Sequence, residues 1–312
     1  MKVVVTGAAG FIGSHVAESL VRDGHEVVGI DCFTDYYPRP AKEENLRLLR
    51  QGDRFRLVEA RLQDVDLLPL LDGASHVYHL AAQAGVRASW GREFAHYTDH
   101  NVLATQLLLE AALRAGRPSV VYASSSSVYG DAPSLPLRED GPCQPVSPYG
   151  VTKLAAEHLA MLYHRCHGLP TVSLRFFTVY GPRQRPDMAF HRFLKAARDG
   201  GAIALFGDGQ QTRDFTYVDD IVSAVRAAPL SGQPGSVYNV GGGERVALHE
   251  VLRLVETVTG RPLRIERQEA QKGDMRDTFA DTAAARRDLA FRSTVPLAEG
   301  LLREWEWIRG QH

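Results

Sequence analysis

A glycine-rich turn between a strand and a helix constrains this chain more than any other sequence feature. The β-branched run Val3–Thr6 predicts a strand, and Gly7-Ala8-Ala9-Gly10-Phe11-Ile12-Gly13 follows it and begins a helix that extends to about Arg22. Glycines at this place let the backbone turn tightly and approach a pyrophosphate, whose charge is met by amide groups at the helix N-terminus. The turn therefore predicts a dinucleotide-binding βαβ unit.

Strands and helices alternate through the first half of the chain. Short, continuously apolar runs are each followed by a longer amphipathic stretch, which is typical of right-handed βαβ units and of a sheet covered on both faces. We therefore expect an α/β fold with a Rossmann-type doubly wound parallel sheet. The predicted strands are Val3–Thr6, Glu26–Asp31, Arg56–Glu59, His76–His79, Ser119–Ala123 and Thr171–Phe176.

The second half is less regular and predicts a smaller α/β substrate-binding domain. A chain of 312 residues exceeds the usual size of one domain. Turn residues cluster at Gly232–Gly235 and Gly241–Gly243, and a short helix is expected near Phe190–Arg198. We assign residues 1–177 with 214–243 to the Rossmann domain and residues 178–213 with 244–312 to the smaller domain.

Charge and cysteine content exclude several classes of partner. A formal net charge of -1 gives no electrostatic reason to expect nucleic acid or a membrane as partner. The first strand begins directly after Met1-Lys2, which leaves no room for a signal peptide, so we expect a cytoplasmic protein. The three cysteines, Cys32, Cys143 and Cys166, are too few and too scattered for a disulfide framework or a zinc site, so we expect free thiols and no metal.

An aspartate ends the second predicted strand where dinucleotide-binding folds hold the adenosine ribose. The carboxylate of Asp31 would accept hydrogen bonds from the ribose hydroxyls and repel the additional phosphate of NADP, which favours NAD as cofactor. The structural alternative is a solvated acid in a loop.

Tyr149 and Lys153 are the strongest candidates for acid–base chemistry. They are four residues apart at the start of the amphipathic stretch Tyr149–Cys166, so a helix would place them on one face. An ammonium group beside a phenol favours the phenolate and is expected to lower the pKa of Tyr149. Any such pair can lie on a surface, but Ser124–Ser127 follows the predicted fifth strand, where parallel sheets bind their ligands.

These motifs resemble the extended short-chain dehydrogenase/reductase family over nearly the whole chain. The resemblance implies bound NAD, with Ser125 bonded to the sugar oxygen that is oxidised, Tyr149 taking its proton with Lys153 beside it, and hydride passing from C4 to the nicotinamide. The implied cofactor site comprises Gly7, Gly10, Phe11, Ile12, Gly13, Asp31, Leu80, Ala81, Ala82, Asn101, Tyr149 and Lys153.

Two further segments are similar to the nucleotide-sugar branch of this family. Gly207–Asp220 resembles the segment that holds the nucleotide, and Arg175–Ala189 resembles a stretch of UDP-glucuronate 4-epimerases. The implied reaction is the NAD-dependent interconversion of UDP-glucuronate and UDP-galacturonate through a transient 4-keto intermediate. Arg213 and Arg276 would neutralise the diphosphate, and Arg185 with Thr178 would bind the C6 carboxylate. The implied substrate site comprises Arg87, Ser125, Ser126, Ser127, Thr178, Arg185, Arg192, Arg213 and Arg276.

Other readings stay open. Dehydratases and decarboxylases of the family carry an acid immediately before Val-Tyr-Gly, where this chain has Ser127, so an epimerase is favoured over a UDP-glucuronate decarboxylase. A UDP-glucose or UDP-N-acetylglucosamine 4-epimerase remains the first alternative, because Arg185 would then reach phosphate or solvent. A non-catalytic NAD-binding regulator is also considered. The resemblance further implies a homodimer formed by the helices around Asn101–Arg114 and Tyr149–Cys166.

Overall fold

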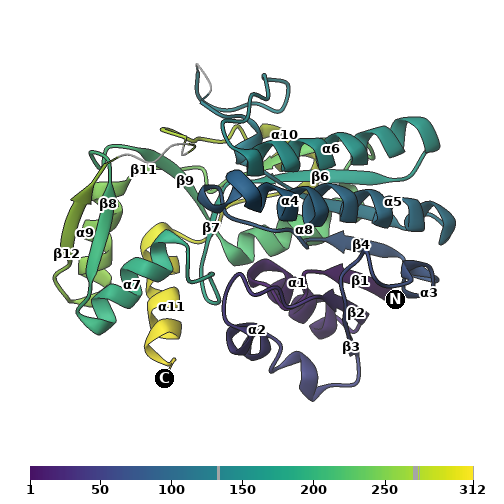
Figure 1. The fold of residues 1–312 in the computed structure, drawn as a ribbon, viewed down its shortest axis with the longest axis horizontal. Coiled ribbons are helices and arrows are strands. Elements are labelled where there is room, and N and C mark those ends of the chain that lie inside the picture. The colour runs from purple at the N-terminus through teal and green to yellow at the C-terminus, as the bar shows by residue number, and fades with distance from the viewer. Residues whose placement is uncertain (132–133, 270–272, 274, 312) are drawn as a thin grey trace.

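The computed structural model describes residues 1–131, 134–269, 273 and 275–311 (Figure 1). Its centre is a seven-stranded sheet in which every pair of neighbouring strands runs parallel. This confirms the predicted Rossmann-type fold. In sheet order the strands are β10 (Val237–Val240), β6 (Thr171–Phe176), β5 (Ser119–Ser125), β4 (His76–His79), β1 (Lys2–Thr6), β2 (Glu26–Asp31) and β3 (Phe55–Glu59).

Helices cover both faces of this sheet because successive strand residues point to opposite sides. Val3 and Val5 belong to the hydrophobic core under helices α1 (Phe11–Arg22) and α8 (Val218–Ser231). Val4 belongs to the core on the other face. That face is covered by α3 (Leu67–Leu71), α5 (Ala104–Arg114) and α6 (Pro148–His167).

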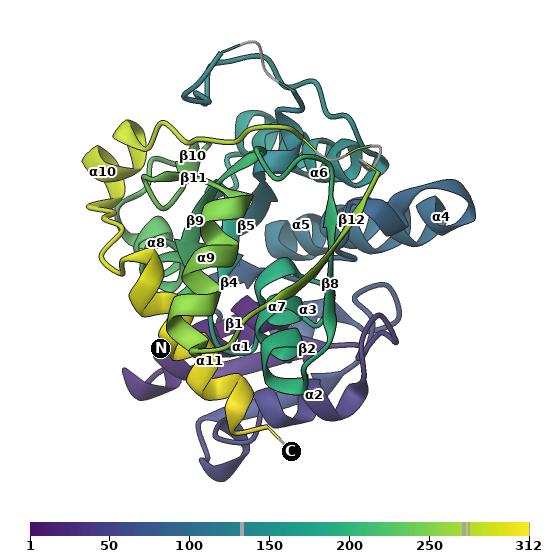
Figure 2. The same cartoon turned by 90° about the vertical axis from the view of Figure 1, so that its left-hand side faces the viewer.

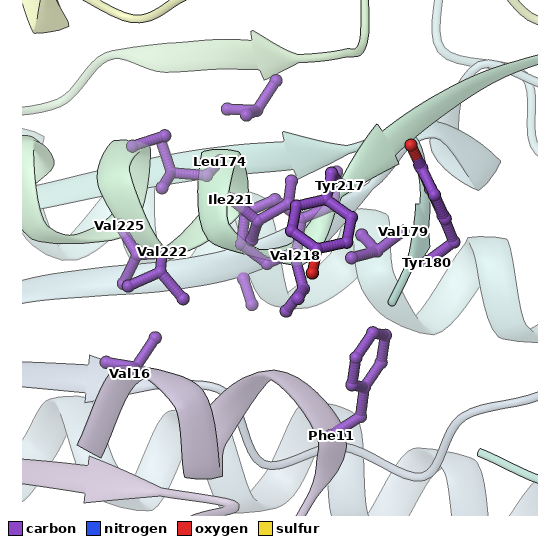
Figure 3. Close-up of a cluster of buried hydrophobic side chains, with 14 of the residues drawn as sticks. Phe11, Val16, Leu174, Val179, Tyr180, Tyr217, Val218, Ile221, Val222 and Val225 are labelled. Atoms are coloured by element: carbon purple, nitrogen blue, oxygen red, sulfur yellow. The ribbon is translucent and has the colours of Figure 1, made fainter. Parts of the chain in front are cut away.

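Figure 3 shows how the first of these cores closes. Val16 of α1 points toward Val222 and Val225 of α8, Phe11 at the start of α1 points toward Val218, and all five side chains are buried. Val179, Tyr180 and Tyr217 continue the same core toward the smaller lobe, so the two parts of the molecule share apolar packing.

The smaller lobe lies at one end of the sheet, and Figure 2 shows α7, α9 and α11 beside the long strands β8 and β12. β8 and β12 pair in parallel, while β7 and β11 flank β9 in a three-stranded sheet. The elements are β7 (Thr178–Tyr180), α7 (Ala189–Asp199), β8 (Ala202–Phe206), β9 (Thr212–Tyr217), β11 (Arg245–Ala247), α9 (Leu248–Thr259), β12 (Arg264–Gln268) and α11 (Leu297–Arg309).

Two segments bear on the expected domain division. β10 pairs with β6 of the large sheet although it follows the smaller lobe in sequence, and α10 (Ala283–Leu289) packs against β10 and α8. The division of the chain at these boundaries stays a prediction. The remaining helical segments are α2 (Arg39–Asn45), α4 (Phe94–Tyr97), a π-helical turn at Thr98–Leu103 and 3-10 turns at Leu49–Gln51, Arg87–Ser89, Gly91–Glu93 and Ser126–Val128.

Candidate active site

The glycine-rich turn brings three backbone segments into close contact. Gly7 has a φ of 71°, and a Cβ atom there would lie 2.8 Å from the amide nitrogen of Ala81 in the loop after β4. A Cβ atom on Gly13 would overlap the carbonyl oxygen of Gly7. Because backbone atoms cannot move aside as flexible side chains do, both positions require glycine for α1 to start this close to the sheet.

The N-terminus of α1 is left open toward a cavity. Its N-cap residue is Gly10, no side chain caps the helix, and no acid lies in its first turn. The first backbone N–H groups of a helix have no partner within the helix, so they favour an anionic group. The cavity, of about 210 Å³, is lined by these predicted cofactor residues: Gly7, Gly10, Phe11, Ile12, Gly13, Asp31, Leu80, Ala81, Ala82, Tyr149 and Lys153.

Asp31 lies in this cavity wall with its carboxylate held by two backbone amides. Oδ2 accepts from the nitrogen of Ala9 at 3.0 Å, and Oδ1 accepts from the nitrogen of Phe33 at 2.8 Å. Burial raises the pKa of Asp31, and these two hydrogen bonds oppose the rise. Each carboxylate oxygen can accept a further hydrogen bond, so the position remains suited to a ribose diol.

Asn101 lies behind the cavity wall. Its side chain is buried, accepts from the nitrogen of Gln83 at 2.7 Å, and donates to the oxygen of Gln83 at 3.0 Å and to Oγ1 of Thr152 at 3.0 Å. Gln83 lines the cavity, whereas Asn101 does not. The structure thus gives Asn101 the task of holding the loop after Ala82.

Tyr149 and Lys153 are placed by the start of α6. Ser147 caps this helix by accepting from the nitrogen of Gly150 at 3.1 Å, and Pro148 occupies the first turn, where its missing N–H costs nothing. Tyr149 lines both the cofactor-side cavity and a second, larger one, and Lys153 lies one turn further on. Ser125, the last residue of β5, hydrogen-bonds Tyr149.

The predicted effect of Lys153 on Tyr149 is wrong for this structure. Burial raises the pKa of Tyr149, and the groups that oppose the rise are the Arg185 charge and the Ser125 hydrogen bond. Burial also lowers the pKa of Lys153 to about 7, with Glu157 opposing it, and the Lys153 ammonium lies 4.5 Å from the ring centre of Tyr122. Both groups lose hydration in the interior, which disfavours their charged forms.

The second cavity, of about 730 Å³, collects most of the predicted substrate residues. Lining side chains among them are Arg87, Ser125, Ser126, Ser127, Thr178, Arg185 and Arg192. Arg213 lines an adjoining cavity of about 170 Å³ together with Ser126, Ser127 and Thr178. Arg276 lies outside both linings, with its side chain 72% exposed and 3.6 Å from Asp208.

Sequence reasoning missed several lining residues. Tyr36, Lys42 and Gln63 line the cofactor-side cavity, and Phe206 and Gln211 line the larger one. Tyr36 and Gln63 follow the carboxyl ends of strands β2 and β3. Because parallel sheets bind ligands at that edge, their positions could have been predicted from the sequence. Gln211 lies within Gly207–Asp220, so the resemblance of that segment was its clue, whereas Lys42 carried none.

A buried polar network holds the carboxyl end of β5 in place. Oγ of Ser124 donates to Oε2 of Glu157 at 2.6 Å. Arg175 binds both oxygens of Glu157, with Nη2 at 2.6 Å from Oε1 and Nε at 3.0 Å from Oε2, and it also donates to the hydroxyl of Tyr129 at 2.7 Å. Because Ser124 lines both cavities, this network fixes the strand end that carries the serine-rich run.

The loop that carries Arg185 is tied to α1. The ring of His15 hydrogen-bonds the oxygen of Pro182 at 2.9 Å, and Arg183 pairs with Glu18 at 2.7 Å. On its other side, Glu304 of α11 accepts from the nitrogen of Gly181 at 2.8 Å. The cofactor-side helix and the substrate-side loop therefore hold a defined spacing.

Two absences apply to the part of the chain that the structure describes. None of its helices combines the length and apolar character needed to span a bilayer. No three or more of its His, Cys, Asp and Glu side chains are grouped so that they would bind a metal ion. Cys32, Cys143 and Cys166 are free thiols, as predicted.

Comparison with known proteins gives a family match over most of the chain and relatives that match nearly all of it. Residues 3–241 match the family described as the NAD dependent epimerase/dehydratase family. The chain is 44% identical over 312 residues to the uncharacterised UDP-glucose epimerase YtcB of Bacillus subtilis, covering 99% of this chain and 98% of that protein. It is 37% identical over 314 residues to a UDP-glucuronate 4-epimerase of Thermodesulfobacterium geofontis, covering 98% and 95%.

A solved structure matches equally well. The crystal structure of UDP-glucuronic acid 4-epimerase from Bacillus cereus in complex with UDP-glucuronic acid and NAD aligns with a TM-score of 0.96 and 42% identity, and the match covers 99% of each chain.

Proposed function

Because the chain belongs to the NAD dependent epimerase/dehydratase family, we propose that it is an NAD-dependent 4-epimerase that interconverts UDP-glucuronate and UDP-galacturonate. The observation that carries the substrate assignment is the position of Arg185, which lines both cavities together with Tyr149. A guanidinium there can bind a sugar carboxylate close to the group that accepts the C4 proton. The similarity to proteins named UDP-glucuronate 4-epimerase supports the same substrate.

The residues on the cofactor side fit NAD. The open N-terminus of α1 suits the pyrophosphate, Asp31 suits the ribose hydroxyls, and Lys153 and Tyr149 line the same cavity. When bound, NAD would supply the hydride acceptor for C4 and, in its reduced form, the hydride donor for the opposite face of the sugar.

Side chains of the protein transfer the C4 proton and leave room for the sugar ring to rotate. Ser125 hydrogen-bonds the C4 hydroxyl. Tyr149 acts as the phenolate, the form that the Arg185 charge and the Ser125 hydrogen bond favour against burial, and accepts the C4 proton as C4 becomes a ketone. The phenol then returns this proton to the same oxygen when the ketone is reduced. Because no net redox change results, one NAD serves every cycle. Between these two steps the 4-keto sugar must rotate so that its opposite face meets the cofactor. The 730 Å³ cavity provides the space for that rotation.

Arg185 also has a protective task in this proposal. A 4-keto uronic acid is a β-keto acid, which loses carbon dioxide when its C5–C6 bond aligns with the carbonyl π system. Charge-assisted bonds from Arg185, with Thr178 in the same cavity lining, hold the carboxylate out of that alignment.

The proposed function is tested by proton NMR of UDP-glucuronate incubated with the purified protein and no added NAD. UDP-galacturonate is expected as the only new sugar nucleotide. A UDP-pentose product would mean that the chain is a decarboxylase and that Ser127 was interpreted wrongly. No reaction would contradict the proposed substrate.

The second candidate is a UDP-glucose 4-epimerase. The relative YtcB carries that name, and the Arg185 guanidinium already pairs with a carboxylate of the protein, Asp187. Turnover of UDP-glucose with no conversion of UDP-glucuronate would favour this candidate.

We also infer a homodimer formed by the helices around Asn101–Arg114 and Tyr149–Cys166. Apolar side chains on α4, the π-helical turn and α6 support it, because large exposed apolar groups gather where proteins associate. These side chains are Phe94, Leu103, Val151 and Leu162, each 38% to 50% exposed. Light scattering in solution tests the assembly. Cytoplasmic residence stays a prediction.

Gly13→Ala is expected to lower NAD affinity by at least about tenfold. The new methyl group would overlap the Gly7 carbonyl, so α1 must shift away from the pyrophosphate position. NAD released by acid from the purified protein measures the retained cofactor. Gly52→Ala is the control, because a Cβ atom at Gly52 meets nothing within 4 Å and its φ is -110°. Equal retention in both variants would contradict the assigned pyrophosphate site.

A further inference from the structure

The guanidinium of Arg185 is held along one of its edges by a neighbouring acid. Nε lies 3.0 Å from Oδ1 of Asp187, and Nη2 lies 3.0 Å from Oδ2. The hydroxyl of Tyr36 donates to Oδ2 at 3.2 Å, and the guanidinium lies 5.8 Å from the Tyr36 ring centre. Arg185 is thus joined to the loop after β2 on the cofactor side.

This contact leaves the other edge of the guanidinium available. Arginine has five N–H donors in a fixed plane, and the side-on pair with Asp187 uses the Nε donor and one Nη2 donor. Two donors on Nη1 and the second donor on Nη2 remain, and they form the end-on edge that matches a carboxylate. A ligand carboxylate on that edge would share Arg185 with Asp187.

The carboxylates of Asp187 and of the sugar would then both bind the single positive charge of Arg185. Burial raises the pKa of Asp187, but the Arg185 charge and the hydrogen bonds outweigh it and lower the pKa, so the acid is ionised at neutral pH. The Asp187 side chain is 37% exposed and that of Arg185 is 22% exposed. At this partial burial, repulsion between like charges about 6 Å apart is worth roughly tenfold in affinity, more than a fully exposed pair would show.

An epimerase of the proposed kind needs such moderation. The 4-keto sugar has to rotate within the site, and a carboxylate held by an unopposed guanidinium would resist that rotation. A carboxylate that is not held would let the C5–C6 bond align with the carbonyl π system and lose carbon dioxide. Interactions that stabilise a bound ground state more than the following transition state lower kcat as well as KM.

We propose that Asp187 is a positioning residue that fixes the Arg185 guanidinium by its side-on edge and weakens its hold on the sugar carboxylate, so that the ketone can turn within the site. The inference rests on the proposed function and names the residue that tunes recognition of the uronic acid. Tyr36 keeps Asp187 in place from the cofactor side.

Binding is measured first, separated from chemistry. In a Tyr149→Phe background, we compare the Kd of UDP-glucuronate and of UDP-glucose with and without Asp187→Asn, by calorimetry on the NAD-loaded protein. Asp187→Asn is expected to tighten UDP-glucuronate binding by roughly five- to tenfold and to leave UDP-glucose binding within twofold. Equal shifts for both sugars, no shift, or weaker binding of UDP-glucuronate would overturn the inference.

Turnover is measured second, with Tyr149 intact. Asp187→Asn is expected to lower both KM and kcat for UDP-glucuronate, which a loss of general stability would not do. A lower KM with unchanged kcat would overturn the part of the inference that concerns ketone rotation. Asp199→Asn is the matched control, because Asp199 binds Arg198 through the same Nε and Nη2 edge near the end of α7, outside both cavities.

The two proposals fail in different ways. If the protein converts UDP-glucose only, the proposed substrate fails in the parent enzyme, without any substitution at Asp187. The Kd comparison still tests the inference in that case, since the affinity for the sugar carboxylate either does or does not depend on the charge of Asp187.

Discussion

Tyr149→Phe is expected to lower kcat for epimerisation by about a thousandfold, within the range of 10²–10⁴ typical of a positioned general acid–base. The substitution removes the hydroxyl that accepts the C4 proton and keeps the ring, which packs edge-to-face against Tyr97 at 6.2 Å. Because the ring remains, the fold and the retained NAD should be unchanged. The measurement is the initial rate of UDP-galacturonate formation under saturating UDP-glucuronate.

Tyr163→Phe provides the control for this prediction. Tyr163 lies on the same helix, and its hydroxyl donates to Glu110, away from both cavities. Its loss should leave kcat within twofold. If Tyr149→Phe retained more than a tenth of the activity, the proton would have to be taken by another group, and Tyr36 would be the next to test because it also lines both cavities.

Glu157→Ala is expected to lower the free energy of unfolding by about 3–5 kcal/mol. Glu157 is 0% exposed and Arg175 is 5% exposed at the side chain, so the substitution leaves a guanidinium buried without its partner. Ser124 loses its acceptor at the same time. Denaturant unfolding followed by circular dichroism measures the change.

Glu43→Ala is the comparison for this second prediction. Glu43 pairs with Arg39 one helical turn away at 2.8 Å, and both side chains are more than two-fifths exposed, at 41% and 47%. An exposed pair of this type contributes about 0.5 kcal/mol or less. If the two substitutions cost the same, the buried pair would not stabilise the fold in the way its burial implies.

The glycine-rich turn and the sheet strands were predictable because their causes are local. The order of apolar residues identifies Glu26–Asp31, His76–His79 and Thr171–Phe176 with the bounds that the structure shows. Tyr149 and Lys153 share a helix face for the same reason, since four residues are about one helical turn. These features depend on neighbours in the sequence.

The electrostatic state of the site was not predictable in that way. The sequence suggested that Lys153 acts on Tyr149, whereas the cation that does so is Arg185, 36 positions away along the chain, and burial outweighs it. Desolvation depends on everything that packs around a group. The pairing of neighbours on one helix contains no information about it.

The sequence by itself determined the parallel α/β fold and placed Tyr149 and Lys153 on one helix face, because spacing along one strand or helix sets where side chains point. The role of Ser125 came from the family resemblance and stays a prediction. Only the tertiary structure decided that Asp187 and Tyr36 hold Arg185, that Glu157 and Arg175 form a buried pair, and that Arg276 lies outside the cavities. Those contacts join segments far apart in the chain, and the order of the strands and the packing of the two lobes bring them together.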